Sequence, residues 1–269
     1  MRELLAAART RAAGRSIATA ALAVLALAAS AAAASAASYT ALGDSYSSGV
    51  GTRTFYNDGT ECKRSPLAYP PKVAADKKLT LTFAACSGAK TGDVLNNQLG
   101  SLNSSTADVT ISIGGNDANF SGVISSCARP WPWTCWGDIT NSENFMRNTL
   151  PGLLDNVYNQ IRSRASSARV IVVGYPQLFN GIECNGLARI SKGEQERLNQ
   201  AADVMAGVIG GRASAHGFRF VDPRTPFSSH EICSSSEWLN GLSNPISESY
   251  HPNVSGQQEY TNEVEPQIG

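Results

Sequence analysis

Residues 39–49 read Tyr-Thr-Ala-Leu-Gly-Asp-Ser-Tyr-Ser-Ser-Gly, a short apolar run that ends at a serine in a glycine-flanked turn. The run is strand-like, and the residues that follow it are typical of a sharp turn. Near the other end of the chain stands Glu248-Ser249-Tyr250-His251-Pro252. A serine hydroxyl is a poor nucleophile until a base takes its proton, so this pairing predicts a fold that brings Ser45 and His251 together.

Short apolar runs alternate with longer amphipathic ones along the chain. Runs rich in Val, Ile, Leu, Phe or Thr predict strands at residues 39–42, 79–85, 109–113, 169–173 and 218–221. Amphipathic segments predict helices at residues 91–99, 144–163 and 191–213, and residues 254–264 form a short polar segment. The alternation predicts an α/β fold, a three-layer α/β/α sandwich around a central, mostly parallel five-stranded sheet.

The first 34 residues are expected to be a secretory signal peptide. Four arginines within the first 15 residues form a basic head, residues 17–29 are almost wholly apolar, and Ala32-Ala33-Ala34 fits a small-residue cleavage site. The apolar part is short for a membrane anchor and no charged stop follows it. We therefore expect a secreted, extracellular protein without a transmembrane anchor. Residues 35–269 are expected to form one catalytic domain, because no linker or repeat divides them.

The charge balance excludes a class of partners. The 22 basic and 22 acidic residues cancel, and the expected signal peptide removes four of the former and one of the latter. A near-neutral chain without a lysine-rich or arginine-rich run has no electrostatic footprint for nucleic acid or an anionic membrane surface. The expected partner is a substrate rather than a nucleic acid, and the chain is expected to be a monomer.

Six cysteines follow the expected signal peptide, and none lies in a Cys-x-x-Cys pair. They are Cys62, Cys86, Cys127, Cys135, Cys184 and Cys233. An even number in an exported chain predicts disulfides rather than a zinc or redox site. About fifteen pairings are possible, and pairing neighbours in sequence would close three separate loops.

Each candidate site residue follows a predicted strand. Ser45 follows the first strand, Gly88 the second, and Gly114-Gly115-Asn116-Asp117 the third, while His251 comes after the last. In parallel sheets, ligands bind beyond the carboxyl ends of the strands. These residues are therefore predicted to converge on one rim of the sheet.

This set of motifs resembles the SGNH hydrolase family, also called GDSL. Its marks are a Gly-Asp-Ser block, a glycine, a Gly-x-Asn-Asp block and a late histidine, and they occur here in that order at Gly43-Asp44-Ser45, Gly88, Gly114-Gly115-Asn116-Asp117 and His251. The chain looks like the secreted lipases and phospholipases of actinomycetes, which carry six cysteines. The resemblance implies the SGNH hydrolase fold and a serine ester hydrolase that cleaves lipid carboxylic esters, of triacylglycerol lipase or phospholipase A type, through an acyl-enzyme.

In that chemistry Ser45 attacks the ester carbonyl, and His251 accepts its proton and later returns it to the leaving alcohol. Three donors are expected to form the oxyanion hole: the backbone N–H groups of Ser45 and Gly88 and the side-chain amide of Asn116. Losing one such donor typically raises the barrier by about 3 kcal/mol. A glycine at position 88 would let the backbone approach the substrate closely, because no Cβ intervenes.

The chain has three histidines, which narrows the choice of base. His216 lies at a predicted helix end and His230 in a polar loop, and neither is placed like a base. His251 precedes Pro252, which biases the backbone of His251 toward an extended conformation.

The third catalytic position departs from the family pattern. The family commonly has Asp three residues before the histidine, where this chain has Glu248. We expect Glu248 to orient His251 and stabilise its cationic form. In the alternative, the backbone carbonyl of Ser249 or Glu248 accepts the imidazole N–H and the enzyme works as a dyad, with Glu248 an ordinary surface residue.

Other site residues have structural alternatives. Ser45 could cap a helix, and Asn116 or Asp117 could cap the next one. Asp44 is expected to hold the nucleophile turn by hydrogen bonds rather than to transfer a proton.

Aromatic residues leave the nature of the substrate open. Residues 127–136 place three tryptophans in or beside a small loop after the third strand. They suit an acyl chain or a lipid–water interface, or they pack inward beneath the loop. Phe55, Tyr56 and Tyr175 could line an acyl groove or simply pack in the core.

No cofactor or metal is expected, because no phosphate-binding glycine loop follows a strand and no His/Asp/Glu cluster has ligand spacing. The alternatives to a lipid esterase are a short-chain carbohydrate acetyl esterase and a non-catalytic extracellular binding module. Because the base must be neutral, activity is expected to rise through about pH 6 to 7.

Overall fold

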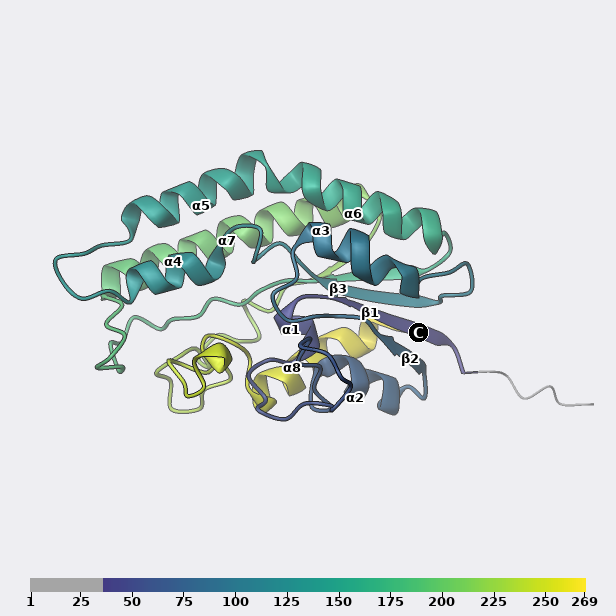
Figure 1. Cartoon of the computed structure of the whole chain (residues 1–269), viewed down its shortest axis with the longest axis horizontal. Coiled ribbons are helices and arrows are strands. Elements are labelled where there is room, and N and C mark those ends of the chain that lie inside the picture. The colour runs from purple at the N-terminus through teal and green to yellow at the C-terminus, as the bar shows by residue number, and fades with distance from the viewer. Residues whose placement is uncertain (1–35) are drawn as a thin grey trace, which may run out of the picture. The chain divides into compact units, whose positions relative to one another are not determined.

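A sheet of five parallel strands runs through residues 36–269, the part of the chain that the computed structural model describes. The expected signal peptide, residues 1–34, lies outside the described residues. In sheet order β2-β1-β3-β4-β5, the strands are Thr80–Phe83, Ser38–Gly43, Asp108–Ser112, Arg169–Val173 and Arg219–Val221. Each one overlaps a predicted strand, and the α/β sandwich expected from the sequence is confirmed (Figure 1).

The central strands β1, β3 and β4 are buried on both faces, which explains why apolar residues follow one another in β4. In β4, Ile171 and Val173 belong to one hydrophobic cluster, whereas Val170 and Val172 belong to a second cluster. Successive side chains of a strand point to opposite faces, so these two pairs of β4 side chains are buried on the two sides of the sheet.

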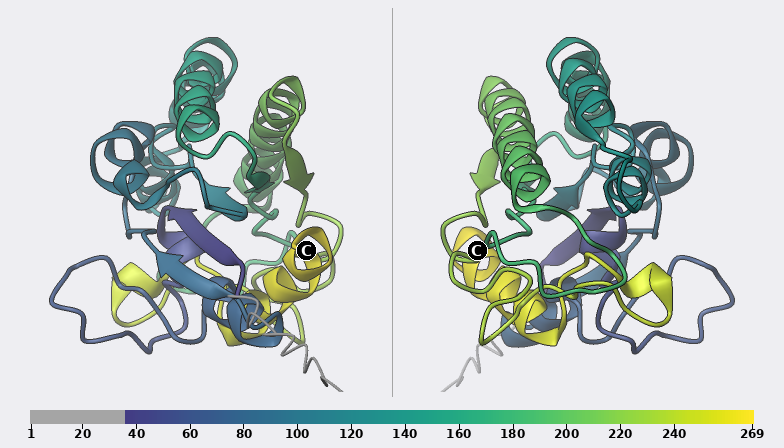
Figure 2. Two further views of the ribbon diagram at one scale, coloured as in Figure 1. Left: turned by 90° about the vertical axis from the view of Figure 1, so that its right-hand side faces the viewer. Right: turned by 90° about the vertical axis from the view of Figure 1, so that its left-hand side faces the viewer.

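Helices cover both faces. One side carries α3 and α4 to α7, and the other carries α1, α2 and α8 (Figures 1 and 2). The α-helices are α1 (Ser45–Ser48), α2 (Tyr69–Asp76), α3 (Thr91–Asp93), α4 (Phe120–Cys127), α5 (Trp136–Asn148), α6 (Leu150–Arg164), α7 (Lys192–Ala215) and α8 (Val254–Val264). The shorter turns are a π-helix, η1 (Val94–Gln98), and the 3₁₀ helices η2 (Leu99–Ser101), η3 (Ile246–Glu248) and η4 (Glu265–Gln267).

Two of the predicted helices differ from the observed ones. The single helix expected at residues 144–163 is in fact α5 and α6, which meet at Thr149 just before Pro151. Proline cannot donate the backbone hydrogen bond that would continue α5, and it is well accommodated in a first helical turn. The helix expected at residues 91–99 is a short α3 followed by the η1 and η2 turns.

The sequence prediction missed α2, α4 and the helical nature of α8. The polar segment at residues 254–264 is α8, whose inner face buries Gln257. Its side-chain amide accepts from the Tyr69 N–H at 2.9 Å and donates to the Tyr46 carbonyl at 3.0 Å. A buried polar residue with such partners leaves no hydrophobic period for a sequence analysis to detect.

Three disulfides join neighbours in sequence: Cys62–Cys86, Cys127–Cys135 and Cys184–Cys233. This is the pairing that the cysteine spacing favoured among the possible ones. The second closes the loop between α4 and α5, and the third joins the loop before α7 to the loop after β5.

Candidate active site

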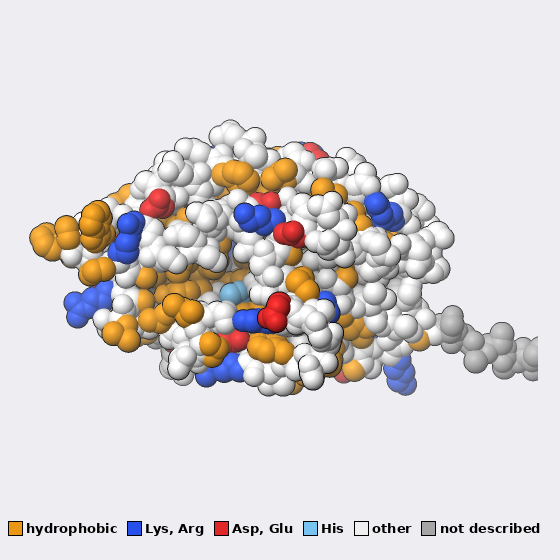
Figure 3. All heavy atoms as spheres, viewed as in Figure 1, with side chains coloured by type: hydrophobic (Ala, Val, Ile, Leu, Met, Phe, Trp, Pro, Cys, Tyr) orange, Lys and Arg blue, Asp and Glu red, His pale blue; other side chains and the backbone are white. Residues whose placement is uncertain are grey.

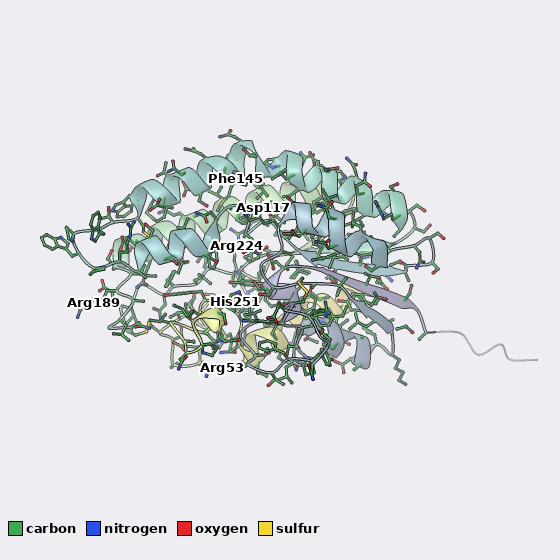
Figure 4. All side chains as sticks on the ribbon, in the orientation of Figure 1. Arg53, Asp117, Phe145, Arg189, Arg224 and His251 are labelled. Carbon is green, nitrogen blue, oxygen red and sulfur yellow. A yellow bond between two sulfur atoms is a disulfide. The ribbon has the colours of Figure 1, made fainter. Side chains whose placement is uncertain are left out.

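The predicted site residues meet at the carboxyl ends of three adjacent strands. Ser45, Gly88 and Asn116 follow β1, β2 and β3, which are neighbours in the sheet, and His251 lies just before α8. In the space-filling view a histidine side chain sits in a hollow among hydrophobic side chains, at the place where Figure 4 labels His251 (Figures 3 and 4). This rim, beside the point where the strand order reverses, is where α/β sheets bind ligands.

Ser45 and His251 are hydrogen-bonded to each other across 206 positions of sequence. The distance between Ser45 Oγ and His251 Nε2 is 2.8 Å. Ser45 is the first residue of α1, and the N-cap of that helix is Asp44, whose carboxylate accepts from the Tyr46 N–H at 3.0 Å. The serine hydroxyl is therefore not used for capping and remains available to the imidazole.

The other imidazole nitrogen faces a backbone carbonyl. His251 Nδ1 lies 2.8 Å from the Ser249 oxygen. Between them Tyr250 has a φ of 59°, a left-handed conformation that turns the chain back so that this carbonyl reaches the ring. A carbonyl only accepts, so Nδ1 carries the proton and Nε2 is the nitrogen that accepts from Ser45.

Glu248 was expected to hold this imidazole nitrogen, and in the structure it does not. Its Oε2 accepts from the Gly51 N–H at 2.6 Å, and the residue is buried rather than on the surface. The side chain projects from the η3 turn toward the loop after α1, so the three-residue spacing to His251 does not bring the carboxylate to the ring. The alternative, with the Ser249 carbonyl as acceptor, describes the observed geometry.

Gly51 joins the two loops of the site. It has a φ of 105°, and a Cβ there would lie 2.3 Å from the Pro252 carbonyl oxygen and 3.0 Å from His251 Cβ. Glycine therefore lets the loop after the serine helix pack directly against the loop of the histidine. The hydrogen bond from the Gly51 N–H to the Glu248 carboxylate also holds the two loops together.

Burial disfavours the charged form of His251. Burial, with a smaller effect of the nearby Lys63, lowers the pKa of this imidazole from 6.5 to about 4. The hydrogen bond to the Ser249 carbonyl acts to raise the pKa and is outweighed. The imidazole is thus neutral, and able to accept a proton, at pH values well below the range of 6 to 7 expected from the sequence.

The expected oxyanion donors are free or partly free. Within residues 36–269, the N–H groups of Ser45 and Gly88 donate to no other group. The Asn116 Nδ2 donates one hydrogen to the Ala89 carbonyl at 3.0 Å, which holds this amide beside the segment of Gly88 and leaves its second hydrogen available.

Glycine at position 88 also has a backbone reason. A Cβ at Gly88 would meet no protein atom within 4 Å, so no neighbouring group of the chain requires its absence. Its φ of 77° does, because residues with a side chain rarely adopt this conformation.

The two acidic residues of the motifs have structural roles, as expected. Asp44 accepts from the Tyr46 N–H and from the Tyr175 hydroxyl, and burial raises its pKa to about 7. Asp117 accepts from the backbone N–H and the hydroxyl of Thr91, at the start of α3 rather than of the next helix.

An apolar pocket opens beside Ser45 and His251, and of the three aromatic residues suggested for an acyl groove only Tyr175 lines it. The empty space in and around the pocket, counted together with the open solvent at its mouth, is about 820 Å³. The wall comes from α4, α5, α7 and the segment after β4. Its apolar members include Phe120, Val123, Ile139, Met146, Leu198, Ala201 and Met205. Phe55 and Tyr56 do not line it.

The tryptophans of the α4–α5 loop point outward. The exposed fractions of Trp131, Trp133 and Trp136 are 91%, 62% and 43%, so they do not form a satellite core. Leu187, in the loop that follows the pocket wall after β4, is 88% exposed. In Figure 3 hydrophobic side chains gather at the end of the molecule where α4 and α5 are joined (Figures 1 and 3).

The other two histidines lie in structural settings. His216 Nε2 pairs with Asp155 at 2.9 Å at the end of α7, and His230 stacks on Trp238 with its Nδ1 against the Ser236 carbonyl.

Comparison with known proteins identifies the class that this fold and site define. Residues 41–259 match the model of the GDSL-like Lipase/Acylhydrolase family. The chain belongs to this family and is an ester hydrolase.

Particular relatives come from Streptomyces. The chain is 46% identical to Lipase 1 of Streptomyces coelicolor over 222 residues, which cover 81% of this chain and 82% of that protein. The crystal structure of phospholipase A1 from Streptomyces albidoflavus is similar with a TM-score of 0.82 at 42% identity, covering 87% of this chain and all of that one. An extracellular lipase from Streptomyces rimosus is similar with a TM-score of 0.80 at 42% identity, covering 87% and 98%.

Proposed function

We propose that this protein is an extracellular lipid esterase in which Ser45 and His251 form a catalytic dyad. The observation that carries the proposal is the 2.8 Å hydrogen bond between Ser45 Oγ and His251 Nε2 at the mouth of an apolar pocket. A nucleophile and its base within hydrogen-bonding distance, beside free backbone donors, is the arrangement that acyl transfer needs.

The reaction proceeds in two halves. His251 Nε2 takes the Ser45 proton as the hydroxyl oxygen attacks the ester carbonyl carbon, and the oxyanion is held by the N–H groups of Ser45 and Gly88 and the Asn116 amide. As the C–O bond to the alcohol breaks, the imidazolium returns the proton to the alcohol oxygen. Water then attacks the acyl-enzyme by the same route and releases the carboxylic acid.

The Ser249 carbonyl takes the orienting role of a triad carboxylate. Its hydrogen bond from Nδ1 fixes the tautomer and the plane of the ring. A neutral carbonyl stabilises the imidazolium less than a carboxylate would, and the burial of the ring keeps the base in its neutral, reactive form. Glu248 acts as a positioning residue through Gly51 and does not touch the reacting atoms.

The acyl chain occupies the apolar pocket. Relatives named lipase and phospholipase A1 support lipid carboxylic esters as the substrate class, and the apolar wall supports acyl groups longer than acetyl. Triacylglycerols and the acyl esters of phospholipids present the same ester to the site.

The exposed tryptophans make contact with the lipid–water interface that presents such substrates. Indole rings suit that boundary because one part of the ring is apolar and the N–H is polar. No helix within residues 36–269 has the length and apolar composition that a membrane crossing needs. Three disulfides and the extracellular relative from Streptomyces rimosus support secretion. The enzyme acts as a monomer in this proposal.

The test is hydrolysis by purified protein beside its Ser45→Ala variant. A triacylglycerol dispersion, a phospholipid dispersion and nitrophenyl esters of increasing chain length are compared. We expect activity that rises from acetyl to medium or long chains and falls on the order of 10⁵-fold in Ser45→Ala. Activity on acetyl esters alone would identify a carbohydrate-type acetyl esterase instead, and activity that survives in Ser45→Ala would overturn the proposed dyad.

A further inference from the structure

The Tyr175 hydroxyl lies between the two segments that carry the reacting groups. It donates to Asp44 Oδ2 at 2.5 Å and accepts from the Gly115 N–H at 3.2 Å. Asp44 directly precedes Ser45, and Gly115 directly precedes Asn116. One hydroxyl, from the segment after β4, is therefore bonded to the residue before the nucleophile and to the residue before the oxyanion amide.

The hydroxyl has little freedom to do anything else. Asp44 is buried, and its second carboxylate oxygen is occupied by the Tyr46 N–H. A Cβ on Gly115 would lie 3.3 Å from the Tyr175 ring, so the ring rests directly on the glycine backbone. The Tyr46 ring packs edge-on against Tyr175 at 5.0 Å, and the Tyr46 hydroxyl donates to the carbonyl of Tyr250, the residue before His251.

We propose that Tyr175 is a positioning residue, whose hydroxyl sets the distance between the Ser45 nucleophile and the Asn116 amide. This inference rests on the proposed roles of Ser45 and Asn116. Without the hydroxyl, both Asp44 and the Gly115 N–H lose a buried partner, and the two strand ends are free to shift relative to each other. An oxyanion hole is effective only when its donors are already in place, so such a shift raises the barrier of the chemical step.

The ring and the hydroxyl of Tyr175 have separable functions. The ring is part of the pocket wall and contacts the acyl chain, whereas the hydroxyl faces Asp44 and Gly115. Tyr175→Phe keeps the ring and removes only the hydroxyl. Its effect is therefore expected on kcat rather than on KM, which a residue that only lines the pocket would not produce.

Tyr158→Phe is a matched control. Tyr158 is a fully buried tyrosine of α6 that is not among the residues lining the pocket. Its hydroxyl has no hydrogen-bond partner within residues 36–269. Removing that hydroxyl tests the general effect of changing a buried tyrosine to phenylalanine.

The experiment measures kcat and KM on a medium-chain nitrophenyl ester for wild type, Tyr175→Phe, Tyr158→Phe and Ser45→Ala, with thermal unfolding to verify folding. We expect kcat to fall about ten- to a hundredfold in Tyr175→Phe, with KM within about twofold, and no change in Tyr158→Phe. An unchanged kcat, or a loss in KM alone, would overturn the positioning role of Tyr175. Persistent activity in Ser45→Ala would overturn the proposed function instead, so the two failures are distinguishable.

Asp44→Asn tests the same hydrogen bond from its acceptor side, also where Tyr175→Phe is unstable, and where both variants fold the double variant completes a mutant cycle. Asp44→Asn changes the acceptor of the Tyr175 hydroxyl. Because both residues act through one hydrogen bond, the double variant should lose little more kcat than the more impaired single variant. Losses that multiply would contradict a shared role.

Discussion

The two sides of the active site are built in opposite ways. The side of the nucleophile and base is held by hydrogen bonds: Ser45 to His251, His251 to the Ser249 carbonyl, and Gly51 to Glu248. The side made by α4, α5 and α7 is formed by apolar side chains such as Phe120 and Met146. Hydrogen bonds fix atoms within tenths of an ångström, whereas an apolar wall only sets a volume. The hydrogen-bonded side should therefore set the rate for every substrate, and the apolar side should decide which substrates enter.

Filling the apolar side should change substrate choice. Ala201, on α7, is buried and lines the pocket. We expect Ala201→Phe to reduce kcat/KM for long-chain nitrophenyl esters about a hundredfold while acetyl ester hydrolysis stays within about twofold. Gln200→Leu, an exposed position on the same helix, is the control. Equal losses on short and long esters would show that this wall also positions the catalytic groups.

The exposed tryptophans at the outer end of the apolar side should affect the hydrolysis of aggregated lipid alone. Replacing both Trp131 and Trp133 by Ala is expected to weaken sedimentation with phospholipid vesicles and to lower vesicle hydrolysis about tenfold, because two exposed indoles leave the interface. Hydrolysis of a soluble short-chain ester should not change. If vesicle binding were equal to wild type, the tryptophans would have no role at the interface.

On the hydrogen-bonded side, Glu248 distinguishes a dyad from a triad. Glu248→Gln keeps an acceptor for the Gly51 N–H, so kcat should stay within about twofold, whereas the same change in a triad carboxylate lowers kcat about 10⁴-fold. Glu248→Ala leaves that N–H unpaired and should cost about 1 to 3 kcal/mol of unfolding free energy. A loss of a hundredfold or more of kcat in Glu248→Gln would show that the carboxylate is a member of a catalytic triad.

The smallest expected effect is that of mild acid. With the pKa of His251 lowered to about 4, kcat/KM at pH 5.5 should lie within about twofold of its value at pH 7.5, whereas a base with an ordinary pKa of 6.5 would lose about tenfold. The pH profile of a soluble ester measures this. Burial raises the pKa of Asp44 to about 7, so a change of kcat/KM near pH 7 could come from Asp44 rather than from His251. Asp44→Asn is the control, because it removes that titration.

The same shift has a consequence for stability. The folded pKa of His251 lies below that of the unfolded chain, so between these values the unfolded state binds the proton and the folded state does not. The contribution of neutral His251 to stability is thus present above about pH 6.5 and is lost as the pH falls toward 4. Thermal unfolding from pH 7 to 4 should show a smaller decline in His251→Gln than in wild type.

Several features followed from residue type and order alone. The central strands β1, β3 and β4 are buried on both faces, and their apolar residues form a pattern that is local enough to find without a structure. The placement of Ser45, Gly88 and Asn116 after consecutive strands then predicted one rim, since parallel strands end on the same side. The proline at position 151, which divides α5 from α6, was also visible in the sequence, although the prediction ran one helix through it.

The pocket and the partner of His251 could not be predicted in this way. The pocket wall combines side chains from α4, α5, α7 and the segment after β4, and no local pattern distinguishes a residue that faces a cavity from one that faces the core. Glu248 has the family's spacing to His251, yet the η3 turn sends its carboxylate to Gly51, while the left-handed Tyr250 turns a carbonyl to the ring. Backbone direction at these positions depends on contacts with the loop after α1.

The sequence by itself determined the fold class and the rim of the sheet, and it indicated the serine and the histidine that we propose as nucleophile and base, because these depend on hydrophobic periodicity and on the rarity of the residue types. Only the tertiary structure decided which group orients the imidazole, which side chains line the substrate pocket, and which hydroxyl links the two strand ends. Those properties arise from distances between segments far apart in the chain, and a backbone turn or a packing contact of a few ångströms sets each of them.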